Sequence, residues 1–113
     1  MHEYSIVQSL LDSCEDNARE NNSTKVLKVV VKIGIMSGVE PSLLQTAFDT
    51  FKEKTICEEA EFIINMQDIV IKCNNCQKES TIGKLDYCCP ICKGVDIKII
   101  DGEDMYLMQL ELN

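Results

Sequence analysis

Four of the seven cysteines have the spacing of a metal site. Cys73 and Cys76 form one Cys-x-x-Cys pair, and Cys89 and Cys92 form a second, with twelve residues between the pairs. Two such pairs can place four thiolates at the corners of a tetrahedron around one zinc ion, with zinc–sulfur distances of about 2.3 Å. Because four thiolates fill the coordination shell, the pattern predicts a structural Zn(II) site, in which the ion holds the fold and does not activate water.

Three alternatives to this assignment stay open at the level of the sequence. Soft thiolates in a fourfold array also bind iron, so a rubredoxin-like site is the main rival metal centre. Such sites usually have glycine directly after each pair, where this chain has Gln77 and Lys93. A disulfide or redox function is the second alternative. Cys88 adjoins Cys89 and is a second choice for the third ligand, but we prefer Cys89 because Cys-Pro-x-Cys keeps the two pairs symmetric.

The only histidine of the chain stands at position 2, beside Met1. A terminal amine has a pKa of about 7.7–8.0, so a metal ion can displace its proton at neutral pH. The Met1 amine, the His2 backbone nitrogen and the His2 ring Nδ1 can then bind one ion together, and Glu3 can supply a fourth ligand. Sites of this kind, rich in nitrogen and oxygen, suit Ni(II) or Cu(II). The residue types alone leave a second interpretation open, which is an exposed histidine of no consequence.

The composition argues against several classes of protein. The 113 residues are enough for one domain, or for one domain that carries a small module. The net charge of −8 argues against nucleic-acid binding, since phosphate contacts need clustered Lys and Arg. No apolar run reaches the roughly eighteen residues that span a membrane, and the first residues lack the pattern of a secretory signal. We therefore expect a cytoplasmic protein, in which cysteines favour metal binding over disulfides.

The periodicity of the apolar residues predicts both helices and strands. The expected elements are a helix over 4–22, a strand over 25–35, a helix from Pro41, a strand over 61–71 bent near Asp68, and extended segments at 97–100 and 105–112. Cys14 falls on the apolar stripe of the first helix, and both Cys14 and Cys57 are expected in the core.

These elements predict an α+β fold, in which a small sheet of about three strands packs with two helices and carries an inserted zinc-ribbon-like lobe. The composition changes at Cys73, and the stretch from 73 to about 96 is poor in large apolar residues. We therefore expect residues 1–71 and 102–113 to form a nickel-binding domain and residues 72–101 to form an inserted zinc-binding domain. A lobe of this size with few aromatic residues needs a metal ion to fold.

The chain as a whole resembles the HypA/HybF family, which are nickel metallochaperones for hydrogenase maturation and, in some bacteria, for urease. The resemblance rests on MHE at the start, on IGIMSGVEP at residues 33–41, on the two cysteine pairs and on a short β-rich tail. It implies a nickel site at Met1, His2 and Glu3, with Glu40 as a further ligand or as a supporting group beside Pro41. It also implies that the paired cysteines bind zinc.

The same resemblance implies partners and a client for the nickel. The implied partner is a GTPase of the HypB family, and the implied client is the precursor of the large subunit of a [NiFe]-hydrogenase. Urease maturation proteins are less strongly implied, because relatives that serve urease often carry histidines beside the zinc cysteines and this chain has none there. No nucleic acid and no membrane are expected as partners.

Two rival functions fit fewer of these observations. A zinc-ribbon module that binds proteins or nucleic acids predicts a basic lobe, but residues 72–101 hold five Lys against four Asp or Glu. An enzyme, either a metal hydrolase or a thiol oxidoreductase, predicts a nucleophile with a neighbouring base, and no such pair stands out. We therefore expect a protein that is not an enzyme.

Overall fold

The computed structural model describes residues 3–84 and 88–113, which form two helices and six strands. The elements are α1 (Glu3–Glu20), β1 (Val26–Gly34), α2 (Pro41–Phe51), β2 (Glu61–Gln67), β3 (Ile69–Cys73), β4 (Glu79–Ile82), β5 (Ile97–Asp101) and β6 (Met105–Leu112). The strands form two three-stranded sheets, in the orders β2-β1-β6 and β4-β3-β5. The predicted α+β fold is therefore confirmed.

The chain divides into two compact units. The first unit comprises Met1–Lys32, Val39–Asn65 and Tyr106–Asn113, and the second comprises Ile33–Gly38 and Met66–Met105. This division assigns residues 33–38, 66–71 and 102–105 to the second unit, whereas the sequence analysis placed them in the first domain. The domain boundaries given above stay a prediction.

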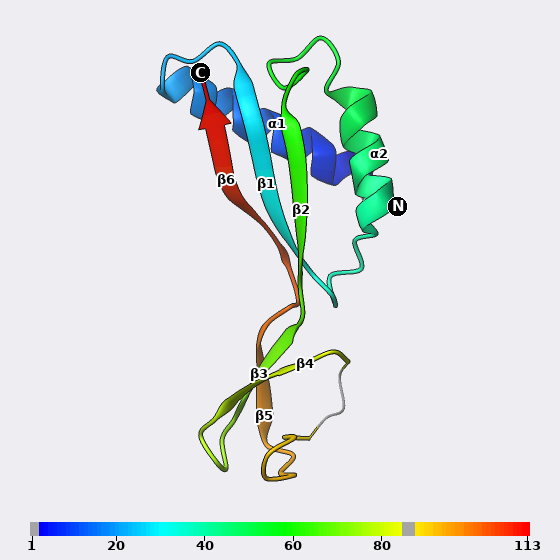
Figure 1. The fold of residues 1–113 in the computed structure, drawn as a ribbon, viewed down its shortest axis with the longest axis vertical. Helices are drawn as coiled ribbons and strands as arrows, with labels where there is room; N and C mark the ends of the chain where they lie inside the picture. The colour runs from blue at the N-terminus through cyan, green and yellow to red at the C-terminus, as the bar shows by residue number, and fades with distance from the viewer. Residues whose placement is uncertain (1–2, 85–87) are drawn as a thin grey trace. The chain divides into compact units, whose positions relative to one another are not determined.

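In the first unit, α1 buries the stripe that its sequence predicts. Its buried apolar residues are Val7, Leu10, Leu11, Cys14 and Ala18. The helix ends where Asn22 adopts a left-handed conformation with φ of 54°, and the Ser23 N–H donates to the Ala18 carbonyl at 2.8 Å. In Figure 1, α1 crosses behind the sheet β2-β1-β6, and α2 lies beside α1 and β2. The apolar stripe of α1 therefore faces the core of this unit.

The second helix, α2, begins at Pro41 as predicted and buries Leu44, Ala47 and Phe48. The Phe48 ring stacks on Phe62 of β2, with ring centroids 4.1 Å apart and planes 8° apart. Stacked aromatic rings contribute about 0.5–1.5 kcal/mol beyond the area that they bury. This contact fixes α2 against the edge strand of the sheet.

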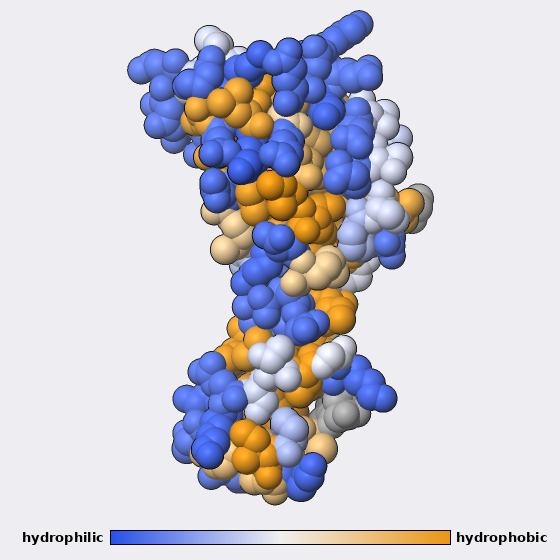
Figure 2. All heavy atoms as spheres, viewed as in Figure 1, coloured by the Kyte–Doolittle hydropathy of each residue, from blue (hydrophilic) through white to orange (hydrophobic). Residues whose placement is uncertain are grey.

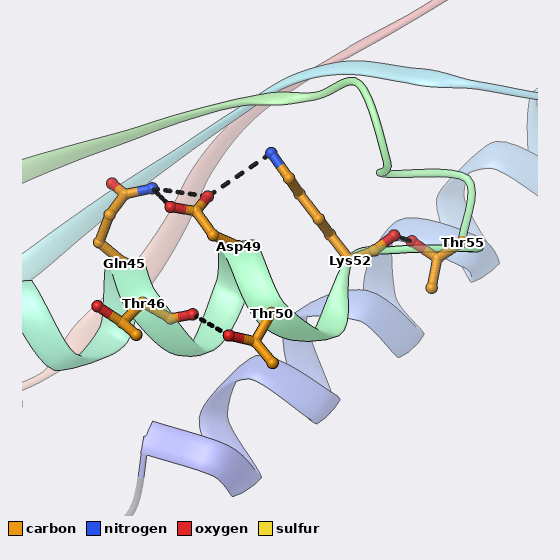
Figure 3. A network of polar contacts seen from close by, with 6 residues as sticks. All are labelled: Gln45, Thr46, Asp49, Thr50, Lys52 and Thr55. Carbon is orange, nitrogen blue, oxygen red and sulfur yellow. Dashed lines mark hydrogen bonds and ion pairs between the residues drawn. The ribbon is translucent and has the colours of Figure 1, made fainter.

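The exposed side of α2 carries a chain of polar contacts, drawn in Figure 3. The Gln45 amide donates to the Asp49 carboxylate at 3.2 Å, and the Lys52 ammonium lies 3.6 Å from the same carboxylate. The Thr50 hydroxyl donates to the Thr46 carbonyl at 2.8 Å, and that of Thr55 to the Lys52 carbonyl. These contacts lie within one helix and its end, so they support α2 locally and form no site.

The central strand β1 departs from simple alternation at its ends. Val29, Val31 and Ile33 are fully buried, as the sequence predicts. Leu27 and Ile35 continue the same alternation along the sequence but are 46% and 45% exposed. Ile35 lies beyond the end of the strand, and at the other end Val26 is buried in place of Leu27. Figure 2 shows further apolar side chains on the sheet face opposite α1.

The predicted strand over 61–71 is in fact two strands that belong to different sheets. It breaks at Asp68, close to the expected bend, so that β2 and β3 pair with different partners. In the second unit, β3 pairs antiparallel with β4 and with β5. The sequence analysis did not predict β4, which is short and lacks large apolar residues apart from Ile82.

Two glycines allow a close crossing of backbones in the second unit. A Cβ added at Gly34 would lie 2.4 Å from the Gly102 carbonyl carbon, and one added at Gly102 would lie 2.8 Å from the Asp68 carbonyl oxygen. Gly102 also has a φ of +98°, which side chains with a Cβ rarely adopt. The Met36 N–H donates to the Gly102 carbonyl at 2.8 Å across this crossing.

Within the described ranges, no helix is long and apolar enough to cross a membrane.

Adjacent leucines of α2 provide a matched test of this packing. Leu44 is fully buried, whereas Leu43 is 54% exposed, and both lie in the same helix. We expect Leu44→Ala to lower the free energy of unfolding by about 2–5 kcal/mol, because it leaves a cavity in the core. Leu43→Ala should lower it by less than about 1 kcal/mol. Urea denaturation measures both values, and equal losses would contradict the orientation of α2.

Candidate metal centres

The four paired cysteines meet at one point in the second unit. The sulfur atoms of Cys73, Cys76, Cys89 and Cys92 all lie within 4.8 Å of one another. The Sγ atoms of Cys73 and Cys92 are 3.5 Å apart, and those of Cys76 and Cys89 are 3.7 Å apart. Four sulfurs at zinc–sulfur distances of about 2.3 Å in a tetrahedron lie about 3.8 Å from one another. The donor set and its spacing therefore fit a tetrahedral Zn(II) ion.

The two pairs are presented by turns of the same geometry. The Gln77 N–H donates to the Cys73 carbonyl, and the Lys93 N–H donates to the Cys89 carbonyl, both at 2.9 Å. Gln77 and Lys93 have φ values of 62° and 65°, in the left-handed region. These are the positions where rubredoxin-like sites usually have glycine, and non-glycine residues adopt this conformation only at some energetic cost. The fold thus bends both turns in the same way without glycine.

Hydrogen bonds from backbone N–H groups change the pKa values of the two thiols in the second pair. Hydrogen bonds from the N–H groups of Cys92 and Ile91 lower the pKa of the Cys89 thiol to about 7. The sulfur of Cys89 lies 3.5 and 3.4 Å from these two nitrogens. For Cys92, the Gly94 backbone N–H lowers the pKa, but the hydrogen bond to Cys73 and burial raise it by more, so that it is about 11. Cys89 is therefore poised as a thiolate, which is the form that binds metal.

The structure also bears on the choice between Cys88 and Cys89. Cys89 is buried and belongs to the cluster of four sulfurs. Among the described residues, Cys88 is not part of that cluster, and it is half-buried. The geometry therefore favours Cys89 as the third ligand, as we expected from the spacing.

Of the residues predicted to bind nickel, Met1 and His2 lie outside the described residues. Glu3 opens α1, and its side chain is 8% exposed. Burial raises the pKa of the Glu3 carboxyl, but hydrogen bonds, including those from the backbone N–H groups of Glu3 and Glu40, lower it by more. The pKa of Glu3 therefore lies below its usual value, and the side chain is a carboxylate at neutral pH.

The backbone N–H of Glu40 donates to the Glu3 carboxylate, while the Glu40 side chain caps the start of α2. The Glu40 Oε1 atom accepts hydrogen bonds from the Ser42 N–H at 3.4 Å and from the Ser42 hydroxyl at 3.1 Å. A side chain in this position satisfies N–H groups that a helix leaves without partners at its start. The structure thus brings Glu3 and Glu40 together, as the predicted site requires, and gives Glu40 a structural role as well.

An apolar hollow beside Glu3 was not predicted. It has a volume of about 250 Å³ and is lined by Glu3, Tyr4, Leu43, Thr46, Ala47, Thr50 and Phe51. The Tyr4 and Phe51 rings meet edge to face, with centroids 4.5 Å apart. Tyr4 falls outside the apolar stripe of α1, so periodicity alone gave no signal for this contact.

Comparisons with known proteins bear on both centres. A family model described as "Hydrogenase/urease nickel incorporation, metallochaperone, hypA" matches residues 1–112. The hydrogenase maturation factor HypA of Aquifex aeolicus is 55% identical over 112 residues, which are 99% of this chain and 97% of that protein. The same factor from Shewanella oneidensis is 52% identical over 112 residues, which are 99% of this chain and 95% of that protein.

Solved structures agree with this similarity. The solution structure of the Ni metallochaperone HypA from Helicobacter pylori has a TM-score of 0.72 and 37% identity, and the match covers 99% of this chain and 97% of that chain. A second solution structure of HypA has a TM-score of 0.78 and 36% identity, covering 100% of this chain and 97% of that chain.

An α+β chain that gathers four cysteine thiols around one point is a small metal-binding protein. The comparisons with known proteins identify the family within this class. The chain belongs to the HypA family of nickel-incorporation metallochaperones.

The cysteine cluster gives a direct test. We expect Cys73→Ser to reduce bound zinc from about one ion per chain to near zero, because three thiolates no longer close the tetrahedral shell. Cys88→Ser is the matched control and should retain its zinc. Elemental analysis of purified protein measures both. Full zinc in the Cys73 variant, or loss of zinc in the Cys88 variant, would contradict the assignment of the four ligands.

Proposed function

We propose that this chain binds Ni(II) at its N-terminus and delivers the ion to the precursor of a [NiFe]-hydrogenase, while a structural Zn(II) ion occupies the four-cysteine cluster. Membership of the HypA family supports nickel as the cargo. The proposed nickel ligands are the Met1 amine, the backbone nitrogen and ring of His2, and Glu3, with Glu40 as a further ligand or a supporting group.

The observation that carries the nickel proposal is the position of Glu3. Its carboxylate is buried at the first turn of α1 and accepts a hydrogen bond from the Glu40 backbone. A carboxylate held in this way keeps the start of α1 next to the loop that contains Glu40, and in the chain it directly follows Met1 and His2, whose nitrogen atoms are the other proposed donors. Such donors suit Ni(II) in a square-planar or tetragonal site.

The proposed function of Glu40 is constrained by its hydrogen bonds. If the Glu40 carboxylate bound nickel directly, it would have to give up some of its contact with Ser42, and capping bonds of this kind contribute about 1 kcal/mol. Its backbone N–H can support the Glu3 carboxylate without any such loss. Support through Glu3 is therefore the less costly of the two functions.

A terminal site with few ligands suits a protein that must release its metal. A client can replace the amine, the imidazole and the carboxylate one at a time, so no step needs all bonds to break together. The four thiolates at the cysteine cluster leave no open position, so we propose that zinc stays bound and holds the second unit in shape. On this proposal the protein carries a metal in the cytoplasm and catalyses no reaction.

The partners that we propose follow from the family. A GTPase of the HypB family would act with this protein, and the large-subunit precursor of a [NiFe]-hydrogenase would receive the nickel. A contribution to urease maturation is a weaker proposal, because no histidine flanks the paired cysteines.

The terminal site is tested by nickel titration of untagged protein in which mass spectrometry shows Met1 to be intact. We expect His2→Ala, and separately one residue added before Met1, each to weaken nickel binding by more than about 100-fold, because ligand loss costs more than loss of a supporting contact. One residue added after Asn113 is the matched control and should bind nickel as the unaltered chain does. Zinc content should be the same in all four proteins.

Two results would contradict the proposal in different ways. Unchanged nickel affinity in the chain extended before Met1 would show that the terminal amine is not a ligand. If the unaltered protein binds no nickel but binds other proteins or nucleic acid through its zinc lobe, the zinc-ribbon alternative is correct.

A further inference from the structure

The four cysteines of the metal cluster differ in how open they are to solvent. Cys73 and Cys89 are fully buried, Cys76 is half-buried, and Cys92 is exposed. Cys92 lies in the turn 90–93, and every residue of that turn is exposed. A small molecule in solution therefore meets Cys92 before it meets the other three ligands.

The sulfur of Cys92 has a close neighbour in the other pair. Its Sγ atom lies 3.5 Å from the Sγ atom of Cys73, and all four sulfurs of the cluster lie within 4.8 Å of one another. The sulfurs of a disulfide are about 2.05 Å apart, so Cys73 and Cys92 would have to approach each other by about 1.5 Å. The two halves of a disulfide between the pairs thus already lie side by side.

Hydrogen bonds make Cys89 a poorer reaction partner for Cys92 than Cys73 is. The N–H groups of Ile91 and Cys92 donate to the Cys89 sulfur, with nitrogen–sulfur distances of 3.4 and 3.5 Å. Among the described residues, no backbone N–H donates to the sulfur of Cys73. Donors of this kind stabilise a thiolate and lower its nucleophilicity. A bond within the second pair would also disturb these contacts, so Cys73 is the favoured partner.

Building on the zinc ion of the proposed function, we propose that hydrogen peroxide oxidises the cluster at Cys92, and that a disulfide between Cys92 and Cys73 then releases the zinc. A bound zinc ion keeps its cysteine ligands as thiolates, and the thiolates most open to solvent oxidise first. The chain has a net charge of −8, and four thiolates around one divalent ion add to it. A neutral oxidant such as hydrogen peroxide therefore approaches more easily than an anionic one.

The reaction has two steps. In the first, the Cys92 sulfur attacks one peroxide oxygen, so that an S–O bond forms and the O–O bond breaks; the hydroxide that leaves takes up a proton from solvent. The product is a sulfenic acid at Cys92. In the second step, the Cys73 thiolate attacks the Cys92 sulfur, the S–O bond breaks, and the hydroxide that leaves also takes up a proton. Two thiolates are thereby oxidised to a disulfide, while one peroxide and two protons become two waters.

Only two thiolates of the cluster remain once this disulfide has formed. Cys76 and Cys89, whose Sγ atoms are 3.7 Å apart, fill half of a tetrahedral shell, so the ion is no longer held. The disulfide itself joins one cysteine of each pair and keeps the two turns together. Reduction returns the thiols and allows zinc to bind again. The cluster is thus a reversible oxidation site as well as a structural centre.

Zinc release from the full-length, zinc-loaded protein tests this proposal. Elemental analysis before treatment should find about one zinc ion per chain. We expect about one zinc ion to be released for each peroxide consumed, as measured with a coloured zinc chelator. A dithiol reductant followed by added zinc should restore the original zinc content. A chain that binds no zinc at the outset would overturn the proposed zinc site and this reaction together.

Peptide mapping identifies the bond that forms. Free thiols are alkylated first, and trypsin cleavage after lysine then gives the peptides 73–78 and 85–93, each of which contains one complete pair. We expect peroxide to join these two peptides, with the loss of two hydrogen atoms. Fragmentation should place the bond between Cys73 and Cys92, and a reductant should separate the peptides.

Cys88→Ala is the matched control, because Cys88 lies in peptide 85–93 but, among the described residues, outside the cluster. This variant should release zinc at the same rate and form the same bond as the unaltered chain. Three results would overturn the proposed reaction and leave the zinc site intact. They are zinc retention in a large excess of peroxide, a first disulfide within one pair, and a first disulfide that includes Cys88.

Discussion

The meeting of four cysteine sulfurs within 4.8 Å is the constraint on which the second unit depends. Among the described residues of the second unit, the buried large apolar side chains are Ile33, Ile69 and Ile71, so few other contacts hold its turns together. Gln77 and Lys93 adopt left-handed conformations that cost free energy in both turns. Thiolates packed so closely would also repel one another, whereas a divalent ion between them turns this repulsion into attraction. A metal ion bound at the cluster would therefore stabilise the shape of the unit.

The first unit is held together in a different way and offers different donors. Its apolar core, with Phe48 stacked on Phe62, orders α1 and α2. That order is what places the Glu3 carboxylate against the backbone of Glu40. If nickel binds at the start of the chain as proposed, its donors there are nitrogen and oxygen, whereas the cysteine cluster offers sulfur donors. Because hard and soft ligands prefer different ions, a transferable and a permanent metal can share one chain without exchanging places.

Local patterns predicted the parts of this structure that depend on local chemistry. The apolar stripe of α1, the start of α2 at Pro41 and the pairing of the cysteines all follow from spacing along the chain. Features that depend on contacts between distant segments were missed. The backbone crossing at Gly34 and Gly102 left no periodic signal, and neither did the contact between Tyr4 and Phe51. The bend near Asp68 was expected, but the assignment of its two arms to separate sheets depends on pairing that spacing does not encode.

X-ray absorption at the zinc and nickel edges of one sample, loaded with both metals, tests the central claim most directly. The claim is that one chain keeps two ions apart by the chemistry of their ligands. The predicted result is a zinc shell made only of sulfur, at about 2.3 Å, and a nickel shell made only of nitrogen and oxygen. Sulfur in the nickel shell would contradict the account, because it would mean that the cysteine cluster and not the start of the chain receives the nickel.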